Sequence, residues 1–339
     1  MSSPRAFIAG CSGQALTPDE IAFFRDADPL GFILFRRNIG DPEQVRALTA
    51  SLRDAVGRAD APVFVDQEGG RVQRLGPPHW PKYPAGRAYA RLARDLEARR
   101  AFVRTGARLI AHDLRSVGID VDCLPVLDVP VPGSHDIIGD RAYDTDPEAV
   151  AALGRAAAEG LIEGGVLPVI KHIPGHGRAG ADSHESLPRV SATLAELRGH
   201  DFPPFRAMAD MPIAMTAHVV YEAIDPERPA TTSPVVISEI IRREIGFDGL
   251  LLTDDLSMKA LSGSFRERAD AAFRAGVDVA LHCNSDLAEA RPVAEAAPAL
   301  TGASLRRVEA ALARIAAPPV SFDVVDARRG LEAALAEAA

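Results

Sequence analysis

Cysteine is scarce in this sequence, with only three copies among 339 residues. Cys11, Cys123 and Cys283 lie far apart, and their spacing fits neither a disulfide framework nor a C-x-x-C metal pair. We therefore expect three reduced, buried thiols. Long apolar runs are also missing. No segment approaches the ~20 apolar residues that a membrane span needs, and the start, MSSPRAFIAGCSG, has too short an apolar run for a signal peptide. These absences predict a cytoplasmic protein with no membrane partner.

Basic residues are too few for a nucleic-acid binder. The chain has 38 Lys and Arg against 47 Asp and Glu, for a net charge of -9, whereas binding to nucleic acid requires a basic surface. Apolar residues make up 47% and charged residues 25% of the chain, which is the balance of an ordinary soluble globular protein. A length of 339 residues accommodates one large α/β barrel or two smaller domains.

The sequence does contain short apolar runs that alternate with longer helical segments, a pattern typical of a parallel sheet crossed by helices. Eight runs rich in Val, Ile, Leu and Phe are predicted as strands: AFIAG near Phe7, GFILF at Gly31, PVFVD at Pro62, IDVDCLPVLDV at Ile119, LPVIKH at Leu167, PIAMTAH at Pro212, GLLLTDD at Gly249 and VDVALHC at Val277. Helices are predicted over 41–56, 95–117, 147–163, 191–209, 234–245 and 265–275. Several begin with a capping Asp followed by Pro, as at Asp41-Pro42.

Eight strands with interleaved helices favour a single (β/α)8 TIM-like barrel over an open, Rossmann-like sheet. The early glycine cluster from Gly10 to Gly13 lacks the G-x-G-x-x-G fingerprint expected of a Rossmann sheet. No internal repeat or low-complexity linker divides the chain. We predict a catalytic barrel over residues 1–317 and a C-terminal helical tail over residues 318–339, which packs on the barrel or extends from it.

Polar residues gather at one end of the predicted strands. In a barrel of this type the carboxyl ends of the strands converge on one mouth, and the chemistry is found there. A single polar residue in such a position is most simply a solvated loop residue, but six coinciding positions favour a site. These positions are Asp66, Asp128, Lys171-His172, His218, Asp254-Asp255 and His282.

The stretch KHIPGHGRAGADSHESLP, which starts at Lys171, carries three histidines. His172 and His176 are four apart, the spacing that places two zinc ligands on one helix face. Pro174 and the neighbouring glycines make a helix unfavourable here. A loop could still chelate a metal, so a metal-dependent hydrolase remains an alternative. Its ligands would be His172, His176, Asp182 and His184.

Asp182 and His184 indicate a second kind of chemistry for the same loop. An aspartate beside an imidazole fixes the tautomer of the ring and favours its protonated form, as a general acid/base requires. His176 fits equally well as a structural histidine that satisfies backbone groups. Glycines at Gly175, Gly177 and Gly180 would let the loop swing over a bound substrate.

Two adjacent carboxylates follow the strand in GLLLTDDLSM, and burying both is costly unless each is paired or hydrogen-bonded. Side chains alternate along a strand, so Asp254 is predicted to point into the mouth and Asp255 away from it in a structural role. An ionised nucleophile at Asp254 would suit a cationic lining. Candidates for that lining are Arg74, Arg141 and Lys171, although most Lys and Arg residues are ordinary surface groups.

Taken together, these motifs resemble glycoside hydrolase family 3. The resemblance rests on VDQEGGRVQRL, GDRAYDTDP, KHIPGHG followed by ADSHESLP, MTAHV and GLLLTDDLSM, which run in order from about Phe7 to Asn284. It is strongest to the single-domain bacterial β-N-acetylglucosaminidases of peptidoglycan recycling. The resemblance implies a TIM-like barrel, no cofactor and no metal. It also implies hydrolysis of terminal β-linked GlcNAc from cytoplasmic muropeptides that carry 1,6-anhydro-N-acetylmuramic acid.

The family pattern implies roles for individual residues. It makes Asp254 the nucleophile, His184 the acid/base and Asp182 the partner of that histidine. Its sugar-binding positions correspond to Asp66, Arg74, Arg141, Lys171 and His172. The sequence departs from the pattern at Ile173 and Tyr143, where aromatic residues and Phe are frequent; neither is a catalytic side chain. We expect a monomer or a weak homo-oligomer whose only partner is a carbohydrate.

The residues and the resemblance both predict a retaining double displacement. Because an imidazole acid/base need not repel an anion, a phosphorylase that uses phosphate in place of water is an alternative on the same fold. A non-catalytic sugar-binding barrel is a third hypothesis. It is the weakest, because binding alone needs neither the Asp254 carboxylate nor the Asp182–His184 pair.

Overall fold

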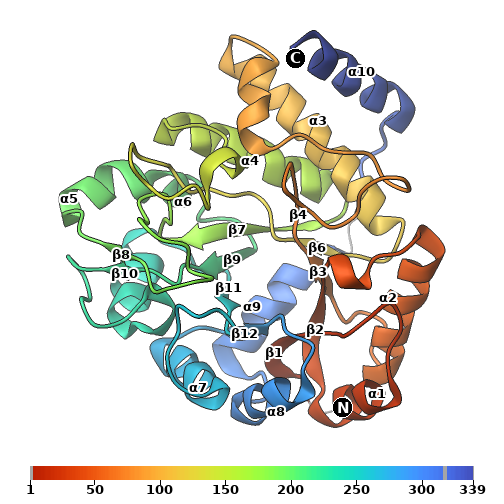
Figure 1. Cartoon of the computed structure of the whole chain (residues 1–339), viewed down its shortest axis with the longest axis vertical. Helices are drawn as coiled ribbons and strands as arrows, with labels where there is room; N and C mark the ends of the chain where they lie inside the picture. The colour runs from red at the N-terminus through yellow and green to blue at the C-terminus, as the bar shows by residue number, and fades with distance from the viewer. Residues whose placement is uncertain (1–2, 316–318, 339) are drawn as a thin grey trace.

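The computed structural model describes residues 3–315 and 319–338. Its centre is a closed barrel of eight parallel strands in the order β1-β12-β11-β9-β7-β6-β3-β2 (Figure 1). The strands are β1 (Arg5–Gly10), β2 (Pro29–Leu34), β3 (Val63–Val65), β6 (Val121–Asp122), β7 (Leu167–Ile173), β9 (Ile213–Thr216), β11 (Leu250–Asp255) and β12 (Val279–His282). Each corresponds to one of the eight predicted runs. The TIM-like barrel is therefore confirmed, and the open Rossmann-like sheet is wrong.

Helices surround the barrel in Figure 1. They are α1 (Pro18–Ala27), α2 (Pro42–Val56), α3 (Leu96–Arg115), α4 (Pro147–Glu163), α5 (Leu194–Glu196), α6 (Pro203–Ala207), α7 (Phe265–Ala275), α8 (Leu287–Ala296), α9 (Gly302–Leu312) and α10 (Val324–Glu337), with wider π-helical turns at η4 (Leu197–Asp201) and η6 (Val236–Glu244). The predicted helix over 191–209 is divided into α5, η4 and α6. Its α-helical hydrogen bonding cannot continue through Pro203 and Pro204, because proline has no N–H to donate.

Alternation along the strands decides which side chains face the barrel interior. On β11, Leu250 and Leu252 pack in the interior cluster, whereas Leu251 packs outward against the helices. Asp254 has the same parity and lines the cavity at the mouth, although the pairing of β11 with β12 shifts register between Leu252 and Asp255. On β7, Leu167 and Val169 belong to the interior cluster, but the pairing with β9 shifts register between Lys171 and Ile173. Regular alternation therefore ends where the predicted site begins.

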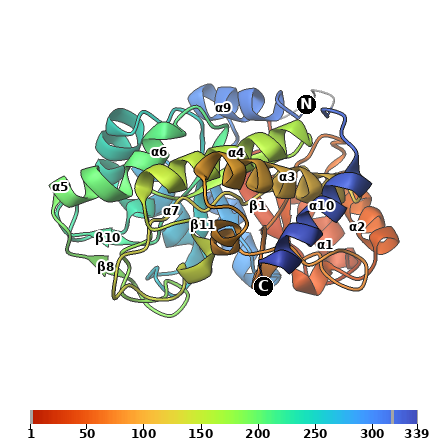
Figure 2. The same ribbon diagram turned by 90° about the horizontal axis from the view of Figure 1, so that it is seen from above.

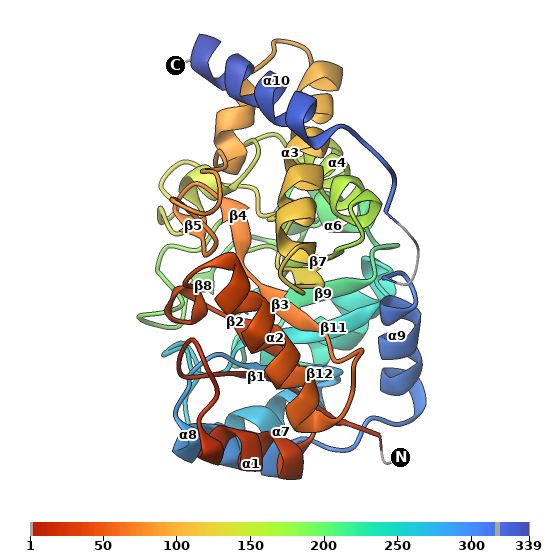
Figure 3. The same ribbon diagram turned by 90° about the vertical axis from the view of Figure 1, so that its right-hand side faces the viewer.

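Short strands and 3-10 turns lie at one end of the barrel. They are the hairpin β4 (Gln67–Gly69) and β5 (Val72–Gln73), the pair β8 (Arg189–Val190) and β10 (Val220–Tyr221), and the 3-10 turns η1 (Arg36–Asn38), η2 (Gly86–Arg91), η3 (Gly139–Arg141) and η5 (Ala230–Thr232). In Figure 3 the hairpin and β8 lie on the left, while α9 and the N-terminus lie on the right. The left side is the mouth, because the strands reach it with their carboxyl ends.

The C-terminal helix α10 lies across α3, as Figure 2 and Figure 3 show. Leu331 is buried in this contact, and Arg328 donates to Asp113 on α3 at 2.9 Å. Asp113 also accepts from Tyr83 Oη at 2.7 Å. The predicted boundary between residues 317 and 318 lies outside the described residues. Across 3–315 and 319–338, no helix has both the length and the apolar composition to cross a membrane.

Candidate active site

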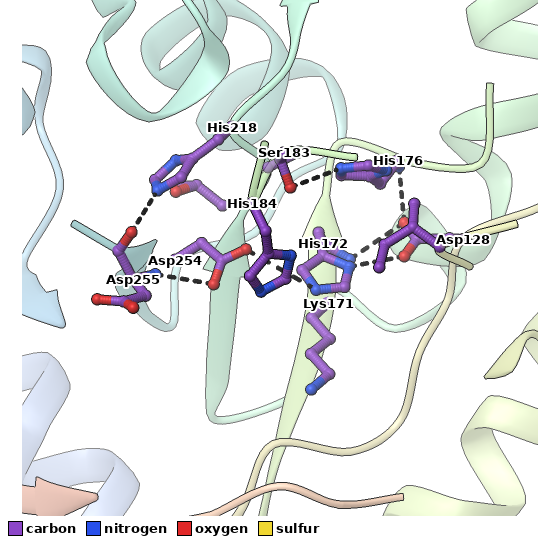
Figure 4. Close-up of polar contacts among 12 residues, drawn as sticks. Asp128, Lys171, His172, His176, Ser183, His184, His218, Asp254 and Asp255 are labelled. Atoms are coloured by element: carbon purple, nitrogen blue, oxygen red, sulfur yellow. Dashed lines mark hydrogen bonds and ion pairs between the residues drawn. The ribbon is translucent and has the colours of Figure 1, made fainter. Parts of the chain in front are cut away.

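A cavity of about 320 Å³ opens at the mouth of the barrel. Seven of the eight site residues predicted from the sequence line it: Asp66, Arg74, Arg141, Lys171, His172, His184 and Asp254. The eighth, Asp182, is hydrogen-bonded to His184. The fold therefore brings together residues from four barrel strands, β3, β6, β7 and β11, or from the loops that follow them. Figure 4 shows the histidine side of this site.

Lys171 lies deep in the cavity, with only 2% of its side chain exposed. Its ammonium group contacts Asp66 Oδ1 at 2.9 Å and Glu68 Oε1 at 2.6 Å. Asp66 also accepts from Arg74 at 3.0 Å. Burial opposes ionisation of Asp66, but Lys171 and Arg74 outweigh it and hold the pKa of this carboxyl well below its usual range. The floor of the cavity is thus a fixed array of charges with hydrogen-bonding capacity for a polar ligand.

Glu68 is a member of this array that the sequence motifs did not single out. Both of its oxygens accept from the Arg141 guanidinium, each at 2.8 Å, in the two-pronged geometry that makes such pairs strong. Burial raises the pKa of Glu68, but Arg141 and Lys171 outweigh it and lower the pKa to about 2. The spacing of Asp66 and Glu68 could have indicated Glu68 as a second carboxylate of the site, because residues two apart share one face of an extended segment. Its partner Arg141 was not indicated by this spacing.

Replacing Glu68 with Gln is expected to lower the free energy of unfolding by about 3 kcal/mol, because it leaves two buried cations short of one anion. Glu222→Gln, in an exposed pair with Arg189, should change it little. The folded pKa of Glu68 lies below its ordinary 4.5, so its contribution is present above that pH and is lost as the pH falls toward 2. Denaturant unfolding at pH 7 and pH 3 measures both effects. An equal loss at both pH values would contradict the charge argument.

Asp254 projects from the end of β11 into the same cavity. Its Oδ1 accepts from the Asp255 backbone N–H at 2.8 Å, and its Oδ2 lies 4.0 Å from His172 Nε2. Burial raises the pKa of Asp254, but His172, His218 and this backbone N–H outweigh it and lower the pKa below its ordinary value. Asp254 is therefore an ionised carboxylate at neutral pH with one oxygen free of hydrogen bonds among the described residues.

Asp255 also lines the cavity, so it does not simply point away from the mouth, but its carboxylate has a structural set of contacts. Its carboxylate accepts from the backbone N–H groups of Ser257 at 2.9 Å and Cys283 at 3.0 Å. These bonds tie the end of β11 to the end of β12. His218 donates from Nε2 to the Asp255 carbonyl at 3.0 Å. Both the carbonyl and the carboxylate of Asp255, the residue after the candidate nucleophile, are therefore hydrogen-bonded.

Asp128 is a buried link between two histidines. Its Oδ2 accepts from His172 Nδ1 at 2.7 Å, and its Oδ1 accepts from the His176 backbone N–H at 2.7 Å. Burial raises the pKa of Asp128, but the two histidines outweigh it and lower the pKa to about 2. Its contact also fixes the ring of His172 with Nε2 directed at Asp254. The sequence placed Asp128 at the mouth but gave no sign of this bridging role.

Asp182 and His184 form the pair that the loop sequence predicted. His184 Nδ1 lies 2.8 Å from Asp182 Oδ1, which also accepts from the His184 backbone N–H at 2.8 Å. Burial opposes ionisation of Asp182, but its bonds to His184 lower the pKa of this carboxyl. The His184 side chain is 63% exposed. Its ring is therefore oriented by Asp182 while its other nitrogen stays accessible to a ligand.

His282 is the one predicted strand-end position that the structure does not bring near the site. It is buried, but its ring packs edge-on against Phe265 on α7, with ring centroids 5.3 Å apart. It does not line the cavity. Its expected place at the mouth is wrong, because the side chain points outward from β12 toward the surrounding helices.

Comparison with known proteins places this geometry in a family. Residues 25–317 match the model for the glycosyl hydrolase family 3 N terminal domain. The chain belongs to glycosyl hydrolase family 3. A curated relative, the beta-hexosaminidase of Alkalilimnicola ehrlichii, is 42% identical over 282 residues, which cover 82% of this chain and 80% of the relative. The resemblance inferred from the motifs is confirmed, and the chain is a glycoside hydrolase.

Solved structures agree with this assignment. NagZ from Neisseria gonorrhoeae in complex with N-trifluoroacetyl-D-glucosamine is 32% identical, with a TM-score of 0.84 over 99% of this chain and 98% of that one. A family 3 β-N-acetylglucosaminidase from Paenibacillus is 31% identical, with a TM-score of 0.87 over 98% of this chain and 67% of that one. The barrel is therefore shared with enzymes of the same family.

Proposed function

We propose that this family 3 enzyme is a β-N-acetylhexosaminidase that removes terminal, non-reducing β-linked N-acetylglucosamine from peptidoglycan fragments of the GlcNAc-1,6-anhydroMurNAc type. In the proposed mechanism Asp254 attacks the anomeric carbon and forms a covalent glycosyl ester, while His184 protonates the leaving oxygen. Water, deprotonated by His184, then releases the sugar with its anomeric configuration retained.

The observation that carries the proposal is that an ionised carboxylate and an accessible, oriented imidazole line one cavity. Asp254 has a lowered pKa and a rigid backbone, which suit a nucleophile. His184 stands on a loop and is held by Asp182, which suits a group that must both give and take a proton. This division of roles needs no second carboxylate near Asp254.

The shape of the cavity supports action on a terminal sugar. Its volume of about 320 Å³ matches a small ligand, and the buried ion pairs of Lys171 close its floor. A chain could therefore not pass through. The N-acyl glucosamine bound by the similar NagZ structure supports N-acetylglucosamine as this terminal unit. The muropeptide aglycone is carried over from the family resemblance.

A trapping experiment tests the mechanism. A fluorinated N-acetylglucosamine analogue with a good leaving group should form a slowly hydrolysed ester, and mass spectrometry of the peptic digest should find the sugar on the peptide that contains Asp254. The first-formed product should have the β configuration by NMR. An α product, or an adduct on a peptide without Asp254, would contradict the proposed double displacement through Asp254.

Phosphorolysis is the second candidate, because an imidazole acid/base leaves room for an anion beside the anomeric carbon. The cationic groups Arg74, Arg141 and Lys171 also line the cavity. Incubation of substrate with and without inorganic phosphate separates the two reactions. Free GlcNAc in both reactions supports hydrolysis, and GlcNAc-1-phosphate formed only with phosphate supports a phosphorylase.

Treatment with a chelator is expected to leave kcat and KM unchanged. The donors of the metal hypothesis already pair in other ways: His172 with Asp128, His184 with Asp182, and His176 with Ser183. Across the part of the chain that the structure describes, no three His, Cys, Asp or Glu side chains are grouped to hold a metal ion. Activity assays before and after EDTA dialysis, with zinc content measured by mass spectrometry, check this expectation. Loss of activity that zinc restores would favour the metal-dependent hydrolase instead.

A further inference from the structure

The residue between Asp182 and His184 is anchored far more firmly than either neighbour. Ser183 is 3% exposed, whereas the His184 side chain is 63% exposed. Figure 4 shows Ser183 directed at His176, on the side of the site away from Asp255. A small hydroxyl residue buried at the tip of an otherwise exposed loop needs a reason, because serine is mostly found at protein surfaces.

Ser183 makes two contacts with fixed parts of the site. Its Oγ lies 3.3 Å from His176 Nε2, and its carbonyl accepts from the Ala260 backbone N–H at 3.2 Å. Ala260 follows β11, the strand that carries Asp254. Within the residues that the structure describes, these are the hydrogen bonds that join 180–187 to the rest of the protein. The remaining bonds of this segment are internal to its own turn.

His176 is a rigid partner for this serine. Its backbone N–H donates to Asp128, which also holds the ring of His172 at 2.7 Å. The preceding carbonyl, that of Gly175, accepts from Tyr221 Oη at 2.7 Å. Burial lowers the pKa of His176 to about 4, and the nearby His172 adds to this shift, so its ring is neutral at neutral pH. A continuous set of contacts thus runs from Asp254 through His172, Asp128 and His176 to Ser183.

We propose that Ser183 is a positioning residue that fixes His184 over the scissile bond by fastening the loop to His176 and Ala260. The proposal rests on the role of His184 as acid/base. Ser183 does not itself touch the reacting atoms. Its loss should therefore weaken proton transfer to the leaving group and leave the attack by Asp254 intact, since the nucleophile belongs to a different strand.

The test compares Ser183→Ala with Ser186→Ala. Ser186 lies in the same loop but is exposed, and its hydroxyl has no hydrogen bond among the described residues. The assay uses phenyl and 2,4-dinitrophenyl N-acetyl-β-glucosaminides, because the second leaving group departs without a proton. With Ser183→Ala, kcat/KM for the phenyl substrate should fall about tenfold, as expected from one lost positioning bond. For the dinitrophenyl substrate kcat/KM should stay unchanged, and Ser186→Ala should match the parent on both.

His184→Ala, run in the same assay, separates this inference from the proposed function. If His184→Ala loses kcat/KM on the phenyl substrate and Ser183→Ala does not, Ser183 has no positioning role and the mechanism stands. If neither variant distinguishes the two leaving groups, the acid/base assignment itself fails. Equal losses on both substrates in Ser183→Ala would mean general damage and would overturn the inference. A double-mutant cycle with His176→Ala should be non-additive, because both changes break the same contact; additive losses would contradict the proposed fastening.

Discussion

Asp254→Ala is expected to lower kcat by about 10⁴-fold or more, because the other carboxylates that line the cavity are already engaged. Asp66 is paired with Lys171 and Arg74, and Asp255 accepts from backbone N–H groups. His172 lies 4.0 Å from the carboxylate but faces it through Nε2 and is held there by Asp128. In the proposed mechanism it orients and stabilises the nucleophile and is not placed to replace it. KM should change much less than kcat, because the buried array around Lys171, which we propose as the sugar-binding floor, stays intact. Steady-state kinetics with an aryl glycoside measure both parameters.

Azide provides the control for this variant. With the carboxylate gone, azide can enter the vacated face and displace the leaving group directly, which forms an α-glycosyl azide while His184 still protonates the departing oxygen. In the parent enzyme the anomeric carbon is displaced twice, so any glycosyl azide that it forms should be the β anomer. Thermal unfolding should be close to that of the parent, since within 3–315 and 319–338 no cation lies within hydrogen-bonding distance of the Asp254 carboxylate. Substantial hydrolysis by Asp254→Ala without azide would show that another residue is the nucleophile.

Much of the barrel was predictable because each strand is short, apolar and bounded by turn residues. Three helices, α1, α8 and α9, were not predicted. For α1 a signal was present: Thr17 and Glu20 form a reciprocal capping box, with the Glu20 carboxylate accepting from the Thr17 N–H at 2.8 Å. Pro292 lies inside α8, where a proline is unfavourable, although the structure accommodates it. A local signal therefore existed for α1, whereas in α8 the proline opposed the helix that forms.

The site was predictable in its single residues and less so in their pairings. The alternation of side chains along β11 predicted that Asp254 points into the mouth. The two-residue spacing of Asp182 and His184 predicted their contact. The pairings of Glu68 and Asp128 could be recognised only in the folded structure. Glu68 pairs with Arg141, 73 residues away, and Asp128 pairs with His172, 44 residues away. No local pattern encodes such partners, because closure of the barrel brings them together.

His184→Ala is expected to lower kcat/KM for a phenyl glycoside by roughly 10²- to 10³-fold, the usual contribution of a general acid. The same parameter for a 2,4-dinitrophenyl glycoside should remain near that of the parent, because that phenolate leaves unprotonated. Its kcat should nevertheless fall, since hydrolysis of the glycosyl ester needs His184 as a base to activate water. Azide should then restore turnover and yield the β-azide, as an anion requires no deprotonation. The exposure of the ring predicts that the melting temperature stays unchanged. Near-normal activity of His184→Ala on the phenyl substrate would show that the proton comes from elsewhere, and the loop of Asp182 and His184 would then have no part in the chemistry.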